Sequence, residues 1–432
     1  MFRFTDLIIF RMTRDCNLNC KYCFMQNKGE HKGELIDFEL YKKIINQIAE
    51  QRYINGRDKI PLQLVFHGGE VLLLGKKRFY EMLTYTVALF QTRGIQYALG
   101  CQTNATLLDD DFAAMLTKFE VSVGLSFDGI DGGNNARTTT IKQDIFEKKF
   151  DILKRNKTQF GFLIVASKTN VENMQATQQY LENLGLHETN TGVVRGYKIN
   201  YAEDMINPGE NSEIELTGKE MFEKVWKPEL ERFIQRKKTQ EYHTHELLVK
   251  SLIDIITYHG NESKSGCGTK WCGAGTHMIA VEPDGEMDYC DRYSKKFPEA
   301  YVQHALDYDF AGLHQIKKAV EYNIMKSRVY KEVGCDTCYA DYICDHGCEA
   351  FYKSKYGTYG IDTRIVCDQH RDFYRFVVEH LEEILQVFIE KGTPISVYDQ
   401  IFFIKENIRS KLLTSGITLT LEDNKIKVAR DE

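Results

Sequence analysis

Apolar runs and amphipathic stretches alternate along the first two hundred residues. Short apolar or alternating runs, each bounded by polar residues or glycine, predict strands at 7–13, 62–70, 97–104, 121–129, 160–168 and 193–201. Between them apolar residues recur at helical spacing, which predicts helices at 38–51, 78–91, 110–119, 145–154 and 174–184. This alternation favours parallel strands joined by right-handed crossovers. We therefore expect an α/β fold with six strands in a barrel or an open sheet.

The rest of the chain has a weaker pattern. Residues 218–259 predict two amphipathic helices, 373–392 a further helix, and 417–428 a hairpin that turns near Asp423 and Asn424. The expected division is a strand–helix domain at 1–205, a helical bridge at 206–265, a cysteine-rich domain at 266–370, and a C-terminal helix and hairpin at 371–432.

Composition narrows the class of protein. The chain has 432 residues, a net charge of −6 and interspersed charges, so it lacks the basic stripe on which nucleic-acid binding depends. The apolar run 7–10 is too short for a signal sequence or a membrane span. We expect a cytoplasmic protein with no nucleic-acid or membrane partner.

The twelve cysteines fall into clusters. In a cytoplasmic protein they do not form a disulfide framework, and metal or iron–sulfur ligation is the better interpretation. Apart from Cys101, which an apolar strand would bury as a core residue, the sets are Cys16, Cys20 and Cys23; Cys267, Cys272 and Cys290; and Cys335, Cys338, Cys344, Cys348 and Cys367.

Four polar segments follow predicted strands. The first cysteine set comes after strand 7–13, and HGGE (67–70), QTN (102–104) and SFDG (126–129) end the next three strands. The carboxyl ends of parallel strands share one edge of a sheet. All four segments should therefore lie on the same rim.

The C-x3-C-x2-C motif CNLNCKYC, together with Gly68-Gly69-Glu70, resembles the radical S-adenosylmethionine (SAM) enzymes over about two hundred residues. The resemblance implies a partial (β/α)6 TIM-like barrel. It also implies a [4Fe–4S] cluster whose fourth iron binds SAM, because three thiolates leave one of four irons open. Reduction of SAM would yield a 5′-deoxyadenosyl radical. The alternative, a zinc knuckle, would need a fourth ligand that the sequence does not supply nearby.

The same resemblance assigns contacts to SAM. Gly68, Gly69 and Glu70 would meet its amino group. Asp128 is alternatively a turn former, and His67 is either a packed strand-end residue or a neighbour of the ligand. The positions that resemble contacts to the SAM ribose and carboxylate are Gln102, Asn104, Ser126, Asp128 and Arg137.

The later cysteines resemble the SPASM extension of peptide- and protein-modifying radical SAM enzymes. Carried over by position, one auxiliary [4Fe–4S] cluster would take Cys267, Cys272, Cys290 and Cys348, and the other Cys335, Cys338, Cys344 and Cys367. Fully ligated clusters suit electron transfer. The chain would then hold three clusters in all. A two-zinc module with the same eight ligands is the alternative.

Asp291 follows a predicted cluster cysteine. In a similar Cys-Asp context, the anaerobic sulfatase-maturating branch uses this position as a base, so the resemblance makes Asp291 a catalytic candidate. The alternative is a structural Asp that pairs with Arg292 or caps a turn. Tyr289, Arg292 and Tyr293 would line a substrate channel.

The leading functional hypothesis is a peptide maturase. The radical would take hydrogen from a residue of a ribosomally made peptide or protein, and an oxidative thioether or carbon–carbon cross-link would close. The first alternative is maturation of a sulfatase, in which a Cys or Ser of the client becomes formylglycine. An alternative of another class is an iron–sulfur electron-transfer protein, which gains nothing from an open iron. The enzyme would need a reducing partner such as flavodoxin or ferredoxin. The cluster motif begins at Cys16, so recognition of a leader peptide is expected to come from elsewhere.

Overall fold

The computed structural model describes most of the first 235 residues and a second segment near residue 290. The described residues are 5–23, 25, 32–138, 142–186, 194–201, 213–235, 273–275, 277–292 and 301–312, with parts of 372–383 and the strands at 417–422 and 425–430. The chain divides into two compact units, one formed by Met1–Glu215, Gly273–Asn323 and Ser354–Tyr356, the other by the remaining residues.

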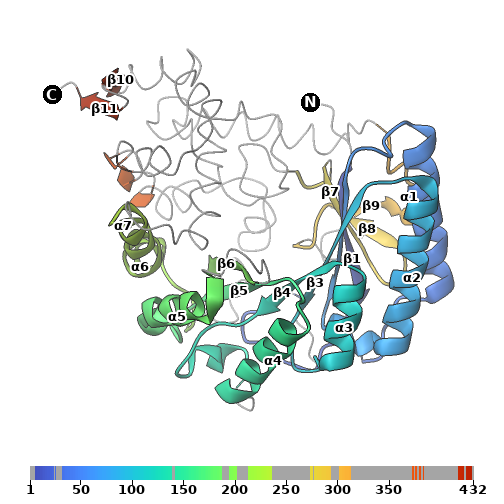
Figure 1. Ribbon diagram of the computed structural model, residues 1–432, viewed down its shortest axis with the longest axis horizontal. Coiled ribbons are helices and arrows are strands. Elements are labelled where there is room, and N and C mark those ends of the chain that lie inside the picture. The colour runs from blue at the N-terminus through green and yellow to red at the C-terminus, as the bar shows by residue number, and fades with distance from the viewer. Residues whose placement is uncertain are drawn as a thin grey trace. The chain divides into compact units, whose positions relative to one another are not determined.

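A nine-stranded sheet organises the first unit. Its order is β6-β5-β4-β3-β2-β1-β7-β8-β9, and the first six strands of the chain run parallel in sequence order (Figure 1). The parallel strands are β1 (Leu7–Thr13), β2 (Leu62–Gly68), β3 (Tyr97–Thr103), β4 (Val121–Ser126), β5 (Phe160–Ala166) and β6 (Val194–Tyr201). The prediction of a mixed α/β fold with six parallel strands is confirmed.

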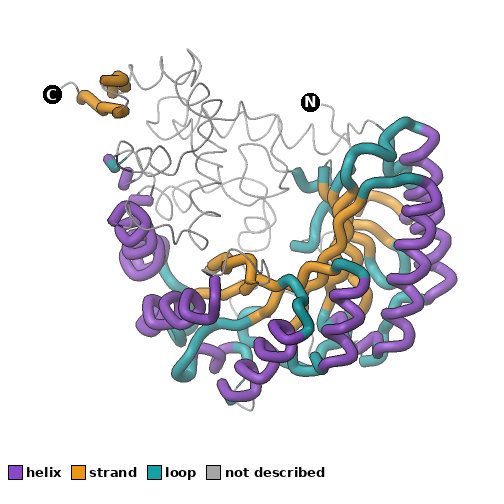
Figure 2. The backbone as a smooth tube through the Cα atoms, viewed as in Figure 1, coloured by secondary structure: helices purple, strands orange, loops and turns teal. Residues whose placement is uncertain are grey.

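Helices connect these strands and lie on one side of the sheet (Figure 2). They are α1 (Phe38–Ile54), α2 (Lys76–Arg93), α3 (Asp110–Lys118), α4 (Gln143–Arg155) and α5 (Met174–Leu181). Short 3-10 turns are η1 (Val71–Leu74), η2 (Gly133–Ala136), η3 (Val171–Asn173) and η8 (Ala305–Asp307), and a π turn, η4 (Glu182–Leu186), extends α5. Each helix overlaps the one predicted from periodicity.

Alternation along the strands separates a packed face from a polar one. In β2, Leu62, Leu64 and Phe66 are fully buried, and the Phe66 ring meets Phe79 of α2 edge to face at 5.4 Å between ring centroids. Burying one such side chain contributes about 1.5–3 kcal/mol. The alternate residues Gln63, Val65 and His67 point to the opposite face, since successive side chains of a strand alternate. The rim that carries the site is therefore backed by a packed helical layer.

The helix ends follow capping rules. Asp37 and Asp109 each accept a hydrogen bond from the backbone three residues on, at 2.9 and 3.0 Å, and begin α1 and α3. Gly94 ends α2 in the left-handed conformation, with φ of 65°. These signals explain why the helices could be placed within a few residues.

Three strands of the first unit were not predicted. The strand β7 (Met278–Val281) pairs parallel with β1, and β8 (Glu286–Asp288) and β9 (Tyr301–His304) continue the sheet antiparallel. The turn between β7 and β8 has Gly285 at φ of 86°, which favours glycine. Part of the cysteine-rich segment 266–370 thus belongs to the same sheet as β1. The predicted four-part division of the chain stays a prediction.

The second unit is described in part. A helix runs through α6 (Gly218–Met221), the π turn η6 (Phe222–Trp226) and α7 (Lys227–Gln235), and Thr217 begins it with a capping box to Glu220. The predicted C-terminal hairpin is confirmed, with β10 (Ile417–Glu422) antiparallel to β11 (Lys425–Arg430). The rest of the predicted helix pair at 218–259, and most of the helix at 373–392, lie outside the described residues.

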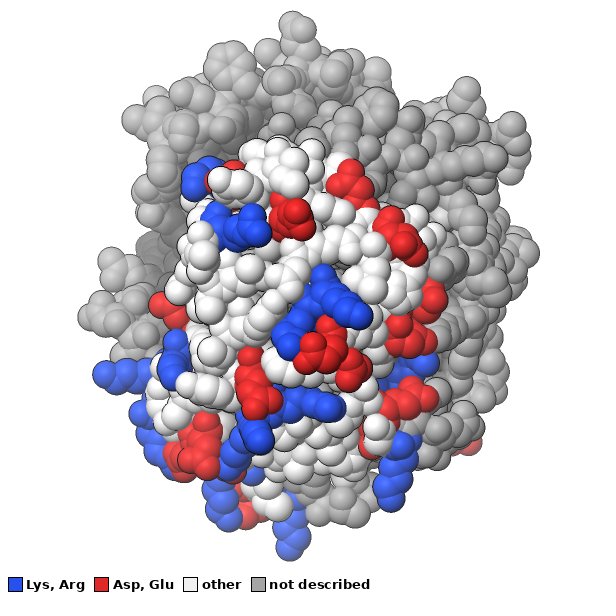
Figure 3. Space-filling model, turned by 90° about the vertical axis from the view of Figure 1, so that its right-hand side faces the viewer, with Lys and Arg blue, Asp and Glu red and all other residues white. Residues whose placement is uncertain are grey.

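Basic and acidic side chains intermingle on the face shown in Figure 3. Exposed ion pairs of this kind include Arg155 with Asp110 and Lys148 with Asp144. Each contributes little to stability because solvent screens it. Among the described residues, no helix has both the length and the apolar character needed to cross a membrane.

Candidate active site

The first cysteine set lies in the loop that follows β1. Cys16, Cys20 and Cys23 are all partly buried, and the backbone N–H of Cys23 donates to the Cys20 carbonyl at 3.1 Å, which closes a turn. We call residues 14–23 the cluster loop. The carboxyl ends of β2, β3 and β4 supply its neighbours, so the predicted rim brings these segments together.

Gly68 and Gly69 allow this loop to approach the end of β2. The Gly69 N–H donates to the Thr13 carbonyl and the Glu70 N–H to the Asp15 carbonyl, both at 2.9 Å. A Cβ at Gly68 would overlap the Thr13 carbonyl oxygen, and one at Gly69 that of Asp15. The glycines thus admit the backbone of the cluster loop. Their predicted contact with SAM stays a prediction.

Glu70 joins the ends of β2 and β3 (Tyr97–Thr103). Its carboxylate is almost fully buried and accepts from the N–H of Leu72 at 3.0 Å, the Thr103 hydroxyl at 2.6 Å and the N–H of Asn104 at 2.7 Å. Burial raises the pKa of Glu70 although these hydrogen bonds oppose the shift. A carboxylate offers about four acceptor sites, so these three bonds leave room for another donor.

Donors surround the sulfur atom of Cys16. The Leu18 N–H lies 3.4 Å and the Asn104 Nδ2 3.9 Å from the Cys16 sulfur. The same Asn104 amide donates to the Asn17 side chain at 2.9 Å. Asn104, which was predicted to contact SAM, thus contacts the cluster loop in this structure. Its contact with SAM stays a prediction.

The three thiols fit an iron–sulfur cluster. Burial raises the pKa of Cys16 to about 11 and of Cys20 to about 12, and each lies close enough to the other sulfurs for charge on them to raise its pKa further. Such thiols ionise when a metal binds them. Three cysteines in one short loop, with N–H donors directed at the sulfurs of Cys16 and Cys20, have the ligand type and number that a [4Fe–4S] cluster with one open iron requires.

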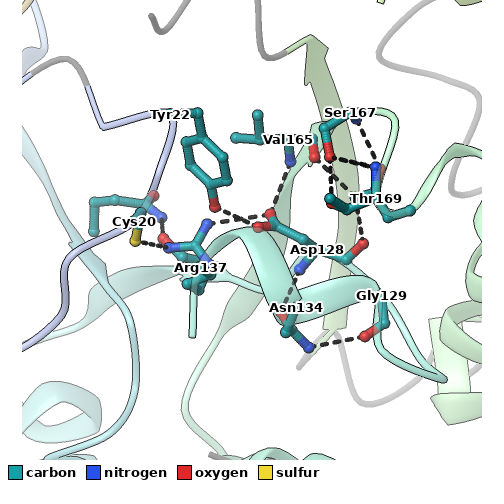
Figure 4. A network of polar contacts seen from close by, with 12 residues as sticks. Cys20, Tyr22, Asp128, Gly129, Asn134, Arg137, Val165, Ser167 and Thr169 are labelled. Carbon is teal, nitrogen blue, oxygen red and sulfur yellow. Dashed lines mark hydrogen bonds and ion pairs between the residues drawn. The ribbon is translucent and has the colours of Figure 1, made fainter. Parts of the chain in front are cut away.

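Asp128, Arg137 and Tyr22 form one buried network beside Cys20 (Figure 4). Asp128 accepts from the Arg137 guanidinium at 3.1 Å and from the Tyr22 hydroxyl, and Arg137 Nη1 lies 3.9 Å from the Cys20 sulfur. Burial alone would lower the pKa of Arg137, but Asp128 and its other neighbours outweigh that effect, so the pKa lies well above its usual range. The guanidinium therefore stays charged.

Gln102 and Ser126 lie side by side on neighbouring strands. The Gln102 amide donates to the Ser126 hydroxyl at 2.9 Å, and both side chains are partly exposed. A Cβ at Gly124 would overlap the Gln102 side-chain oxygen, so glycine there makes room for it. These polar groups are available to a ligand on this face.

Asp291 lies just after β8 (Glu286–Asp288), next to the buried Cys290. Its backbone carbonyl accepts from Arg11 of β1, the register partner of His67 on β2. Burial lowers the pKa of His67, and the charge of Asp291 opposes the shift. The predicted catalytic carboxylate thus comes close to the rim.

Arg11, Arg14 and Glu282 were missed by sequence reasoning. Glu282 is 1% exposed and accepts from Arg11 of β1 and from Arg14 of the cluster loop, at 2.7 and 2.9 Å for Arg14. These two cations hold the pKa of Glu282 below its usual range although burial opposes them. An Arg within an apolar strand was the available sequence signal, because such a residue needs a buried partner.

The other predicted cluster ligands lie outside the described residues. They are Cys267, Cys272, Cys335, Cys338, Cys344, Cys348 and Cys367. Cys101 is 3% exposed in β3, which confirms that it is a core residue.

Residues 7–140 match the family model described as a 4Fe-4S single cluster domain. The chain is also 23% identical to the cysteine-type anaerobic sulfatase-maturating enzyme of Clostridium novyi over 85% of this chain and 94% of that one. This chain is a homologue of the radical SAM maturases. It therefore carries a radical-SAM-type 4Fe-4S domain and is an enzyme.

One further protein resembles this chain in sequence, and one solved structure resembles it in fold. The subtilosin biosynthesis protein AlbA of Bacillus subtilis is 23% identical over 68% of this chain and 57% of its own length. The solved structure titled native anSMEcpe with bound AdoMet and Cp18Cys peptide has a TM-score of 0.69 at 20% identity, and the match covers 87% of this chain and 97% of that one. At 20% identity, the match to this solved structure shows a shared fold and nothing more.

Proposed function

We propose that this radical SAM enzyme oxidises a residue of a peptide or protein substrate. The observation that carries the proposal is the cluster loop, which holds three partly buried cysteines and whose backbone is bonded to the Gly68-Gly69-Glu70 segment on the same rim as Gln102 and Ser126. Cys16, Cys20 and Cys23 would hold a [4Fe–4S] cluster. When bound, this cluster and SAM would supply the one-electron chemistry that removes a hydrogen atom from the substrate.

The protein's own groups would position SAM and the substrate. Gly68, Gly69 and Glu70 would face the amino group of SAM, and the free acceptor site of Glu70 is available for it. Asn104 and the paired Gln102 and Ser126 would contact other polar groups of SAM. Asp291 would accept the proton that the substrate releases when it is oxidised.

The finer structural predictions belong to this proposal. A partial (β/α)6 barrel formed by β1–β6 would enclose the rim, and a SPASM domain would bind two auxiliary [4Fe–4S] clusters through the eight later cysteines. Reduction by a flavodoxin or ferredoxin would start the reaction. The reduced thiols suit a cytoplasmic location.

Two products are candidates. The leading hypothesis is an oxidative thioether or carbon–carbon cross-link within a ribosomally made peptide, which the relation to a subtilosin biosynthesis protein supports. The second is formylglycine, formed from a Cys or Ser of a sulfatase, which the nearly full-length match to an anaerobic sulfatase-maturating enzyme favours. The relation to maturases favours both of these over the third hypothesis, an electron-transfer protein without chemistry of its own.

The test is anaerobic turnover followed by mass spectrometry. The reconstituted, reduced enzyme should cleave SAM to 5′-deoxyadenosine, and a variant with Cys16, Cys20 and Cys23 all replaced by alanine should not. A cysteine-bearing precursor peptide that loses two hydrogens and keeps its sulfur indicates a cross-link, and a sulfatase peptide whose cysteine loses its sulfur indicates formylglycine. SAM cleavage by the triple variant would contradict the proposal.

A further inference from the structure

The Asp128–Arg137 pair is held in place by contacts that do not involve any ligand. Asp128 is fully buried, and its carboxylate also accepts from the Val165 N–H at 2.9 Å. The Asn134 side chain accepts from the Asp128 N–H at 2.8 Å, and the Asn170 amide donates to the Asp128 carbonyl at 2.8 Å. The carboxylate therefore has a fixed place between β4, β5 and η2 (Figure 4).

This carboxylate orients the guanidinium. Arg137 Nη2 donates to Asp128 at 3.1 Å, and the other terminal nitrogen, Nη1, then lies 3.9 Å from the Cys20 sulfur. Because the guanidinium is planar, fixing one edge on a carboxylate fixes the direction of the other N–H groups. The side chain is 7% exposed, so water screens its charge weakly.

The cluster loop is tied to the same place by independent contacts. The Lys21 N–H donates to the Ala136 carbonyl at 2.8 Å, and the Tyr22 hydroxyl donates to Asp128. Tyr22 also packs with Ala136, Val165 and Ile214 in an apolar cluster against which Cys20 lies. The position of the Cys20 sulfur beside Arg137 is thus set by backbone, hydroxyl and apolar contacts together.

We propose that Arg137 is a tuning residue for the SAM-binding cluster: clamped by Asp128, it faces the thiolate of Cys20 and raises the reduction potential of the cluster. Reduction adds negative charge to a cluster, and a cation or an N–H donor at a ligand sulfur stabilises that charge. This role is separate from the contact with the SAM ribose or carboxylate that the resemblance implied for Arg137, which stays a prediction. It rests on the proposed function only in that Cys16, Cys20 and Cys23 hold the cluster.

The test is an EPR-monitored redox titration of the reconstituted protein without SAM. The relevant signal is the one that disappears when Cys16, Cys20 and Cys23 are replaced together. Arg137→Met should shift its midpoint potential to more negative values, and Arg137→Lys should restore part of the shift. Asp128→Asn should move the potential in the opposite direction, because the amide oxygen can still accept from Arg137 and hold it in place while one negative charge is removed. Because SAM is absent from the titration, a shift in Arg137→Met does not depend on any contact between Arg137 and SAM.

Three outcomes would overturn the inference. One is an unchanged potential in Arg137→Met; if SAM binding is weakened tenfold or more in the same variant, Arg137 acts on SAM alone. A second applies if Arg137→Met fails to fold. It is a midpoint potential that shifts in the same direction in Arg137→Lys and in Asp128→Asn. A wild-type protein whose cluster loop binds no iron would overturn the proposed function as well, whereas the first two results would leave the proposed function intact.

Discussion

At the residue scale, the absence of a side chain matters as much as the presence of one. Gly69 lies where a Cβ would overlap the Asp15 carbonyl oxygen, so this position is closed to every other residue unless the cluster loop moves. The GGE motif therefore has a structural role that does not depend on a ligand. It fixes the distance between β2 (Leu62–Gly68) and the loop that bears the cysteines.

Replacing Gly69 with alanine should displace the cluster loop. We expect the Gly69→Ala protein to keep its secondary structure but to bind about four fewer irons after reconstitution, since one [4Fe–4S] cluster would be lost. Gly100→Ala is the matched control, because a Cβ there would lie at 3.6 Å from its nearest neighbour, an ordinary contact. Iron analysis and circular dichroism measure both effects. Full iron content in Gly69→Ala would show that the loop tolerates the methyl group.

Asp291 should separate SAM cleavage from product formation. Asp291→Asn keeps the shape of the side chain and removes the base, so product should fall by a factor of about 10²–10⁴ while 5′-deoxyadenosine still forms. Chromatography and mass spectrometry of the same reaction measure both species. Asp284→Asn, an exposed site on the β7–β8 turn, is the control. Normal product yield from Asp291→Asn would reduce Asp291 to a structural residue.

At the scale of elements, Glu282 links the cluster loop to the β7–β8 hairpin. The carboxylate binds Arg14 of the loop and Arg11 of β1 (Leu7–Thr13), and the same Arg11 binds the Asp291 carbonyl. Cys290 and Asp291 follow the hairpin directly. Glu282 thus sets the position of the candidate base relative to the cysteines.

Removing the charge of Glu282 should destabilise the protein strongly. Glu282→Gln removes the carboxylate that two buried or half-buried cations share, although Asp288 remains 3.5 Å from Arg11 and Glu34 remains 3.7 Å from Arg14, so we expect a cost of about 2 kcal/mol. Urea unfolding under anaerobic conditions measures the change. The control is Asp284→Asn, because Asp284 is 44% exposed and lies 4.0 Å from Arg14; it should cost less than about 0.5 kcal/mol. Equal free energies of unfolding for the two variants would show that the ion pairs of Glu282 with Arg11 and Arg14 do not stabilise the protein.

The parallel strands and their helices were predictable because the sequence signals that define them lie within the elements or directly beside them. Alternation in LQLVFHG and caps such as Asp37 and Asp109 lie within a few residues of the elements they define. The shared rim followed from the rule that parallel strands end at one edge. The strands β7 to β9 escaped notice because MIAV and EMD are short runs that periodicity cannot classify.

The site's cysteines were predictable from spacing, but its polar contacts were not. Arg11 and Glu282 are 271 positions apart, and only the pairing of β1 with β7 brings them together. Asp128 and Arg137 were predicted to contact SAM, yet local sequence holds nothing that shows whether they bind a ligand or each other. Such partners depend on tertiary packing.

At the scale of the whole molecule, the account implies three clusters of different kinds. Reconstituted wild-type protein should contain about twelve irons per chain, and the variant that lacks Cys16, Cys20 and Cys23 should retain about eight. Iron and sulfide analysis, with zinc measured in parallel, gives these numbers. About four irons in the wild type, or zinc in place of the rest, would contradict the two auxiliary clusters but leave the SAM-binding site untouched.

The most direct test of the central claim is the EPR spectrum of the reduced, reconstituted enzyme with and without SAM. The account predicts that SAM changes the signal assigned to the cluster of Cys16, Cys20 and Cys23, since it binds the iron that these three thiolates leave open. A signal that is identical in the presence and absence of saturating SAM would contradict it.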